Sequence, residues 1–183
     1  MRTIKNVLSQ WHRWLLWLLL SFLFWTWIFT LLTDTTPDRK VTLYAQVAEC
    51  RDRELALRLE EAKPEGLKMV KAHAFSYAMF DTADLESADL YIFHSSELEK
   101  HLESLAPLDG ETLGGGREVW RTSDGQCYGI KIYDAASDRG AAQEYLRYDP
   151  GEDCYLCLNA ASLHLESGDG AALPIAEALL QLN

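Results

Sequence analysis

An uninterrupted apolar run near the N-terminus constrains this chain more than any other feature. The nineteen residues from Trp14 to Leu32 carry no charge, and only one serine and two threonines interrupt the apolar side chains. About twenty apolar residues in a helix cross a hydrocarbon core of roughly 30 Å. A surface helix of a soluble protein keeps a polar face, which this run lacks. We therefore expect a transmembrane helix over residues 14–33 that contacts the lipid bilayer through residues 14–32.

The charges on either side of the run predict its orientation. Three basic residues and no acidic residue precede it, whereas two acidic residues follow it before the next basic one: Arg2, Lys5 and Arg13 before, Asp34 and Asp38 after. Basic residues are retained on the cytoplasmic side of a membrane. We expect residues 1–13 to form a cytoplasmic tail and the chain beyond the helix to lie outside the cell membrane.

A cleaved signal peptide is the main alternative to an anchor. Its apolar core would span about 7–15 residues and would end at a small-x-small cleavage site. The run here is longer, and residues 30–34 (TLLTD) contain no such site. A lipoprotein cleavage box at Cys50 is disfavoured too, because Glu49 precedes the cysteine and the position lies far beyond the run. The sequence favours a retained, single-pass anchor.

The chain beyond residue 33 is strongly acidic. It holds 14 Lys and Arg residues against 28 Asp and Glu residues, a net charge of −14. Proteins that bind nucleic acid neutralise phosphates with basic patches, and anionic lipid surfaces also attract basic segments. The charge therefore argues against nucleic acid as a partner, and it is typical of a solvated surface.

The rest of the chain alternates strand and helix patterns after a polar linker over residues 34–40. Residues 41–47 and 67–74 resemble strands, and Leu55, Leu59 and Ala62 have helical spacing between them. Residues 88–93 form a nearly continuous apolar run, which is typical of a strand buried on both faces. We expect residues 41–183 to form one α/β domain with a small, mostly parallel sheet flanked by helices.

Later segments are predicted with less regular spacing. Ser96 and Glu99 have the spacing of a capping box, which predicts a helix with its N-cap at Ser96 and a buried leucine stripe through Leu105. The Asp124-Gly125 pair predicts a tight hairpin between strands at 118–121 and 127–133. Another strand at 154–159 and a closing helix lined by Ile175, Leu179 and Leu182 complete the pattern.

The four cysteines do not predict a reactive site. Cys154 and Cys157 have redox spacing, but they lie within a predicted strand, where residues i and i+3 point to opposite faces. Cys50 lies at a predicted helix start, as a capping-region residue or a disulfide partner. Outside the cytoplasm these three and Cys127 permit disulfides, and three pairings are open. The histidines are scattered without metal-ligand spacing, so we expect no metal and no cofactor.

Several short motifs occur in an order that resembles a known family. They are Ala88-Asp89-Leu90-Tyr91-Ile92, the helix start at Ser95-Ser96-Glu97-Leu98, the turn Leu105-Ala106-Pro107-Leu108-Asp109, and Tyr128-Gly129-Ile130. Together they resemble the first lobe of extracellular solute-binding proteins of ABC importers, of the type II periplasmic-binding-protein kind. The stretch from Tyr155 to Asn159 and the one from Ala176 to Leu180 resemble that family's return strand and closing helix.

The sequence departs from this family in two ways. Lys131 stands where the family's "YGIP" segment has proline. Only about 20 residues separate Tyr133 from Cys154, too few for the second lobe that normally completes the ligand cleft. The resemblance therefore implies a single-lobe derivative.

Ligand contacts are expected in loops at the carboxyl ends of the strands, where open α/β sheets bind ligands. The resemblance places Ala48 and Glu49 there after the first strand, and Ser95 and Ser96 after the buried one. No nucleophile with an adjacent base is visible, so we expect a non-enzymatic recognition domain for a small solute or an envelope protein. The alternative is an accessory or assembly subunit of an envelope or transporter complex that acts through protein–protein contacts.

Overall fold

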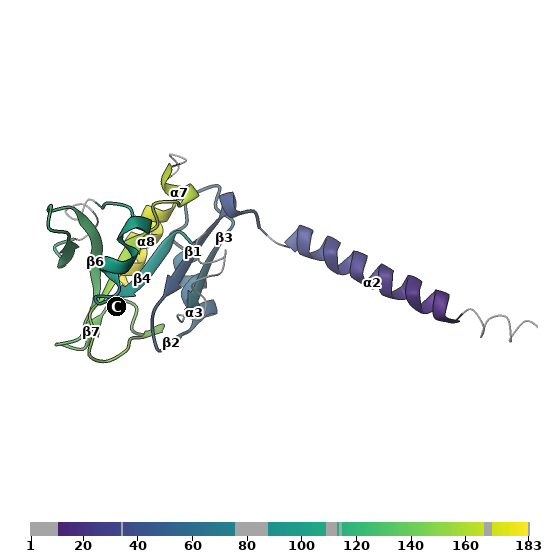
Figure 1. Cartoon of the computed structure of the whole chain (residues 1–183), viewed down its shortest axis with the longest axis horizontal. Coiled ribbons are helices and arrows are strands. Elements are labelled where there is room, and N and C mark those ends of the chain that lie inside the picture. The colour runs from purple at the N-terminus through teal and green to yellow at the C-terminus, as the bar shows by residue number, and fades with distance from the viewer. Residues whose placement is uncertain are drawn as a thin grey trace, which may run out of the picture. The chain divides into compact units, whose positions relative to one another are not determined.

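The computed structural model describes residues 11–33, 35–75, 88–108, 113, 115–166 and 170–182 of the chain. The chain divides into two compact units, Met1–Thr35 and Thr36–Asn183 (Figure 1). Residues 1–10 of the expected cytoplasmic tail and Asp34 of the expected linker lie outside the described residues. The boundaries expected for tail, span, linker and domain stay predictions.

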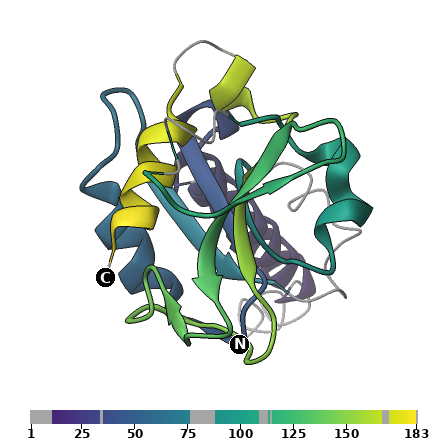
Figure 2. The same ribbon diagram turned by 90° about the vertical axis from the view of Figure 1, so that its left-hand side faces the viewer.

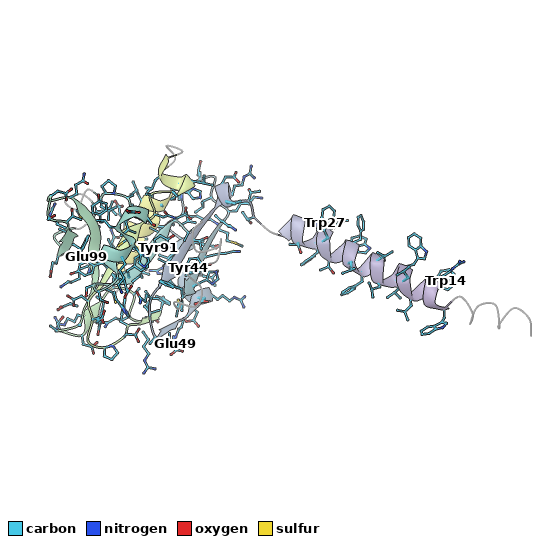
Figure 3. The ribbon with its side chains drawn as sticks, in the orientation of Figure 1. Trp14, Trp27, Tyr44, Glu49, Tyr91 and Glu99 are labelled. Atoms are coloured by element: carbon cyan, nitrogen blue, oxygen red, sulfur yellow. The ribbon has the colours of Figure 1, made fainter. Side chains whose placement is uncertain are left out.

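The first unit contains helix α2, Trp11–Thr33. Its 23 residues span about 35 Å at a rise of about 1.5 Å per residue. Within it, Arg13–Thr30 is long and apolar enough to cross a membrane. Large apolar side chains, among them Trp14 and Trp27, are exposed along the helix (Figure 3). The length and composition expected of a spanning helix are therefore present.

The threonines of α2 satisfy their hydroxyl groups within the helix. Thr26 donates to the carbonyl of Phe22 at 2.8 Å, and Thr30 donates to the carbonyl of Thr26 at 3.0 Å. A hydroxyl that is paired in this way carries no unsatisfied donor into hydrocarbon. Both threonines are thus compatible with a lipid environment.

The second unit is built on a mixed sheet with the strand order β3-β1-β4-β9-β6-β5, and β7 pairs with β6 beside this path. Its strands are β1 Lys40–Ala45, β3 Met69–Ala74, β4 Leu90–His94, β5 Val119–Arg121, β6 Cys127–Asp134, β7 Arg139–Gly140 and β9 Cys154–Leu158. A separate two-stranded ribbon joins β2 Glu49–Cys50 to β8 Leu146–Arg147. The α/β class expected from the sequence is correct.

The expectation of a mostly parallel sheet is wrong. Strands β3, β1 and β4 are parallel, but β9 is antiparallel to both β4 and β6, and β6 is antiparallel to β5 and β7. For β5 and β6 the reason is the length of the connection. A parallel neighbour needs a crossover of a dozen or more residues, whereas β5 and β6 are joined by a short turn in which Gly125 has φ +86°. The predicted hairpin is confirmed.

Helices cover both faces of the sheet (Figure 2). Helix α3, Asp52–Glu60, and helix α8, Ala172–Gln181, lie on one face. The short helix α5, Leu98–His101, lies with the 3-10 turn η3, Leu102–Ser104, on the other. Two further short elements complete the unit, the 3-10 turn η1 Pro37–Arg39 and helix α7 Leu163–Glu166.

The two faces have different cores. The face under α3 and α8 is mainly aliphatic, with fully buried residues that include Leu43, Leu55, Leu59, Ile92, Ile175 and Leu179. The other face is aromatic and includes Tyr44, Phe75, Tyr91, Phe93 and Tyr155. Figure 3 labels Tyr44 and Tyr91 of this set. Strand β4 lies between β1 and β9 and contributes to both cores, as the continuous apolar run predicts.

The predicted capping box at Ser96 is wrong. Helix α5 begins only at Leu98, its N-cap position is Glu97, and no side chain caps it. The Ser96 hydroxyl instead donates to the Glu152 carboxylate at 2.8 Å, and Lys100 donates to the Glu97 carboxylate at 2.8 Å. Because α5 begins two residues after Ser96, the N-cap position falls on Glu97, and the Ser96 side chain is oriented toward Glu152. The bond to the ionised carboxylate holds the hydroxyl in this orientation.

A buried polar network joins the amino ends of the strands. The carboxylate of Asp89 accepts hydrogen bonds from the Thr42 amide at 2.8 Å and from the Ser162 hydroxyl at 2.6 Å. Burial raises the pKa of Asp89, although both hydrogen bonds act against that rise. His164 Nε2 lies 2.9 Å from the carbonyl of Lys40. The network fastens the start of β1 to the segment that precedes α7.

Candidate functional site

The carboxyl ends of β1 and β4 lie at the same end of the sheet, because these two strands are parallel neighbours. We call this end the carboxyl edge. The amide of Gln46 donates to the carbonyl of Ile92 at 2.9 Å, and the amide of His94 donates to the Gln46 side chain at 3.1 Å. These bonds hold the two loops that leave the strands side by side. All four residues expected at the site follow this pair of strand ends.

All four expected site residues contact the segment that follows β6. The amide of Ala48 donates to the carbonyl of Arg147, and the amide of Ser95 donates to the carbonyl of Asp153, both at 2.9 Å. Glu49 pairs with Arg147 in the β2–β8 ribbon. The Ser96 hydroxyl bonds to Glu152. The structure thus places the four residues along one edge, which residues 146–153 cover.

Glu49 lines a pocket. This pocket has a volume of about 500 Å³, and its lining residues come from the β2 region, the end of β6 and the segment after β6: Glu49, Arg51, Tyr133, Asp138, Gln143, Glu144, Tyr145, Leu146, Arg147, Tyr148 and Pro150. Figure 3 shows Glu49 at the end of the unit where β2 lies. We call this the edge pocket.

Stacked tyrosines hold one wall of the edge pocket. The rings of Tyr133 and Tyr148 are 4.5 Å apart and nearly parallel, at 7°. The Tyr148 hydroxyl donates to the carbonyl of Ala141 at 2.7 Å, and the Tyr133 hydroxyl donates to Asp138 at 2.8 Å. That hydrogen bond to Asp138 raises the pKa of Tyr133 to about 12. Both phenols are therefore neutral structural groups at physiological pH.

The loop between these tyrosines has an unusual backbone. Asp138 and Ala142 have φ of +52° and +56°, in the left-handed region that non-glycine residues seldom adopt. Ala142 is fully buried, and its amide donates to the carbonyl of Leu182 at 2.8 Å. Such conformations cost about 1–3 kcal/mol each and persist only where surrounding contacts enforce them. The loop is consequently held in one shape.

Two arginines supply positive charge at the edge pocket. The Arg51 guanidinium lies 3.4 Å from Glu54, and that of Arg147 lies 3.8 Å from Glu49. Both arginine side chains are more than half exposed, so these ion pairs are screened by water and are weak. The two guanidinium groups can therefore exchange these partners for an anionic group of a ligand.

A histidine lies between two carboxylates beside the pocket. His94 Nε2 is 3.5 Å from Asp149, and Nδ1 is 3.8 Å from Glu152. Glu152 also accepts the Ser96 hydroxyl, so the carboxylate stands between serine and imidazole. A serine nucleophile needs its hydroxyl on the base itself. This arrangement orients side chains but does not activate Ser96.

Lys131 ties β6 to the segment that covers the edge. Its ammonium lies 2.7 Å from Glu118 and 2.8 Å from Asp153, and its side chain is 14% exposed. Burial lowers the pKa of Lys131, but hydrogen bonds to these two carboxylates outweigh burial and raise it above its usual value. Lys131 therefore anchors the connection between β6 and β9.

The cysteine thiols at these strands are buried and poorly acidic. Cys154 belongs to the aliphatic core and Cys157 to the aromatic one, so they face opposite sides of β9, as their spacing predicts. Burial raises the pKa of Cys154 to about 12 and also raises those of Cys50 and Cys157. Thiolates are the reactive form of cysteine. These three positions are unsuited to thiol chemistry.

The described residues contain no group of three or more His, Cys, Asp or Glu side chains arranged to hold a metal ion. Comparison with known protein families, with curated proteins and with solved structures finds no match to this chain. The candidate site is therefore inferred from its geometry alone.

Sequence reasoning missed most of the edge pocket. Arg51 and Tyr133 lie within or beside predicted elements and carry no site pattern of their own. Arg147 and Tyr148 were not singled out because the segment after β6 has neither helical nor strand periodicity. One signal was available. A connection of about 20 residues that is too short for a lobe, yet contains Tyr145 and Tyr148, is typical of a packed loop.

Proposed function

We propose that this chain is a membrane-anchored recognition domain, derived from one lobe of a solute-binding protein, that binds its target at the edge pocket without catalysis. The observation that carries the proposal is the covering of the carboxyl edge by residues 146–153, which contact every loop expected to bind ligand and form the edge pocket with the β2 region. Ligands of open α/β sheets bind at this edge.

The resemblance to a solute-binding lobe has support in the arrangement of β9 and α8. Strand β9 returns antiparallel beside β4, and α8 closes the aliphatic face, in the places where a return strand and closing helix are expected. The connection between β6 and β9 contains only short elements. Under this proposal a packed loop stands where a complete family member has its second lobe.

The chemistry of the edge pocket favours a small polar ligand with a carboxylate. Two exposed guanidinium groups are available for bidentate binding of such a group. Glu49 and Glu144 also line the pocket and would favour an amine on the same ligand. The pocket volume of about 500 Å³ lies within the usual range for small-molecule sites.

A thermal-shift screen of the full chain in mild detergent tests this proposal. The probes are glutamate, glycylglutamate, glucose and N-acetylglucosamine. A ligand at about 100 times its dissociation constant stabilises the folded state by about 2.7 kcal/mol. We expect a raised midpoint with a zwitterionic probe, lost in Arg51→Ala. The matched control is Arg58→Ala, since Arg58 forms an i,i+3 pair with Glu61 outside the pocket.

A shift that persists in Arg51→Ala would place binding elsewhere. A chain that none of the probes stabilises would favour the second candidate function, an accessory or assembly subunit that acts through protein contacts. One observation favours that candidate, the exposed Leu57 side chain beside the outer edge of β3. The threonine hydroxyls of α2 are less suited to such contacts, because they already donate within the helix.

We also propose that the second unit lies on the extracytoplasmic side of the membrane. The support for this location is the excess of basic residues before α2 and the apolar composition of the helix. In this arrangement the second unit faces the extracytoplasmic space, with its acidic surface solvated.

A further inference from the structure

Strand β3 forms one edge of the sheet. It pairs with β1 on its inner side, and among the described residues no strand pairs with its outer side. The amide of Val70 instead donates to the Glu60 carboxylate of α3 at 3.3 Å. An open strand edge presents backbone groups that can extend the sheet with another strand. This edge is therefore a place where a second chain can add.

Helix α3 presents a short stripe of residues beside this edge. Arg53, Ala56, Leu57 and Glu60 follow helical spacing and line a groove of about 360 Å³ whose other wall is β3. Leu57 is 58% exposed, and it and Leu163 are the large apolar side chains exposed in the described part of the second unit. The exposed Leu57 in a groove beside an open strand edge is suited to packing against a second chain.

The charged residues at the two ends of the stripe differ in their contacts. In the described part of the chain Arg53 forms no ion pair, whereas Arg51 and Arg58 on either side pair with glutamates. Among the described residues, the interaction seen for the Glu60 carboxylate is the hydrogen bond that it accepts from the Val70 amide. Along the helix the stripe is therefore basic at Arg53, small at Ala56, apolar at Leu57 and acidic at Glu60. When a second copy of the stripe lies antiparallel to the first, each residue faces a complementary one.

We propose that two copies of this chain pair through β3 and α3 around a twofold axis. In this arrangement Arg53 of one copy faces Glu60 of the other, and Leu57 of each copy packs over Ala56 of the other. A twofold interface repeats each contact, so the complementary pair occurs twice. The self-complementary charge pattern selects a second copy as the occupant of the groove.

The register of the strands agrees with that of the helices. The amide of Phe75 donates inward to Ala45, and backbone groups alternate between the two sides of a strand, so Val70, Ala72 and Ala74 direct their amides outward. An antiparallel pairing centred on Ala72 would join Val70 of one copy to Ala74 of the other. The Ala74 carbonyl would then replace the Glu60 carboxylate as the acceptor of the Val70 amide, which leaves Glu60 to pair with Arg53.

Helix α3 is positioned so that the centre of its stripe lies beside the centre of β3. Glu60 contacts Val70 at one end, and Asp52 lies 3.4 Å from His73 at the other. The middle of the stripe, between Ala56 and Leu57, therefore lies opposite the middle of β3. One twofold axis satisfies both elements.

Anchoring by α2 would favour this pairing. Two chains confined to one membrane meet at a high effective concentration, which makes a small interface sufficient. A twofold axis along the membrane normal leaves both anchors in the same bilayer. The inference rests on α3 and β3 and is independent of the edge pocket.

Energy transfer between labelled full-length chains in lipid vesicles tests the proposal. Donor-labelled and acceptor-labelled chains are mixed at low protein density, with Leu57→Asp as the unassociated baseline and Leu163→Asp as the matched control, since Leu163 is an equally exposed leucine outside the groove. We expect transfer above baseline for the native chain and for Leu163→Asp. Arg53→Glu and Glu60→Arg should each weaken dimerisation about tenfold, equivalent to about 1.4 kcal/mol.

The decisive measurement mixes the two charge variants. Arg53→Glu chains carry two acids and Glu60→Arg chains two bases at the facing positions, so both pairs become complementary only in the mixed dimer. We expect transfer to return when one variant carries the donor and the other the acceptor. Transfer that is unaffected by the single variants, or that stays at baseline in the mixture of two chains with native thermal midpoints, would overturn the proposal. A native chain at baseline would overturn it as well.

Discussion

Replacing Lys131 with methionine should destabilise the second unit by an amount that depends strongly on pH. Methionine keeps the length and most of the packing of the lysine side chain but removes its charge. Breaking a buried ion pair costs about 3–5 kcal/mol, and breaking an exposed one costs less than about 1 kcal/mol. Lys131 is 14% exposed, and its partners Asp153 and Glu118 are 28% and 65% exposed. We place the loss at neutral pH at about 2 kcal/mol, between these limits.

The pH range of this loss follows from the two shifted groups. A hydrogen bond from Lys131 holds the pKa of Asp153 below its usual value, so the contribution is present above about pH 4 and is lost as the pH falls through the folded-state value. The pKa of Lys131 is raised, so the contribution is complete below about pH 10 and is lost as the pH rises through that higher value. The difference between native and variant chains should therefore be largest between these limits.

Differential scanning fluorimetry of the full chain in mild detergent measures this effect. In a unit of about 150 residues, 1 kcal/mol changes the melting midpoint by about 2–4 °C, so the variant should melt about 4–8 °C lower at pH 7. The gap should shrink at pH 3.5. Lys68→Met is the control, since Lys68 is an exposed lysine, and it should change the midpoint by no more than about 2 °C. An equal gap at both pH values would refute the electrostatic explanation.

Three further predictions concern the core, the edge and the anchor. Ile92→Asp should abolish cooperative melting, because Ile92 is fully buried and an unpaired charge there costs about 4 kcal/mol or more; an unchanged midpoint would contradict the central position of β4. Ser96→Ala should lower the free energy of unfolding by at most about 1 kcal/mol, because the bond from Ser96 to Glu152 is exposed. A larger loss would indicate that Ser96 caps the helix. A C-terminal alkaline phosphatase fusion should be active, and a mature chain that begins beyond residue 25 would contradict the retained anchor.

The parallel half of the sheet was predictable because its signals are local. The strand over 41–47, the helical spacing of Leu55 and Leu59, and the apolar run before His94 each lie within one element, and β1, α3 and β4 occur there. The hairpin at Gly125 was equally local, since it depends on two turn residues. Periodicity and turn chemistry suffice wherever the neighbour in sequence is also the neighbour in space.

The place and direction of β9 in the sheet were not predictable from these signals. Strand β9 lies between β4 and β6, two strands that precede it in the chain, and its apolar residues fit either direction equally well. Ser96 shows the same limit in a single side chain. Its spacing to Glu99 satisfies the capping pattern, but Glu152, far along the chain, provides the better partner. Contacts between distant segments decided both outcomes.

The edge pocket depends still more on distant contacts. Its wall requires Tyr133 to stack on Tyr148 and Lys131 to bind Asp153, and neither pair has a fixed spacing that a sequence pattern would reveal. The expected residues Ala48 and Glu49 lie at the end of the sheet where this pocket is found, because strand ends leave loops there. The residues that cover that edge came only from the fold.

A pocket built in this way would recognise its target differently from a two-lobed protein. Two lobes close around a ligand, whereas the loop over the carboxyl edge is already fixed by Lys131, by the stacked tyrosines and by the contacts of Ala142. A preformed site loses little conformational entropy on binding, so a few polar contacts suffice for useful affinity. Its shape then cannot report occupancy by a large movement. A signal from such a domain would have to arise from what the bound ligand presents at the pocket mouth, or from the pairing of anchored copies.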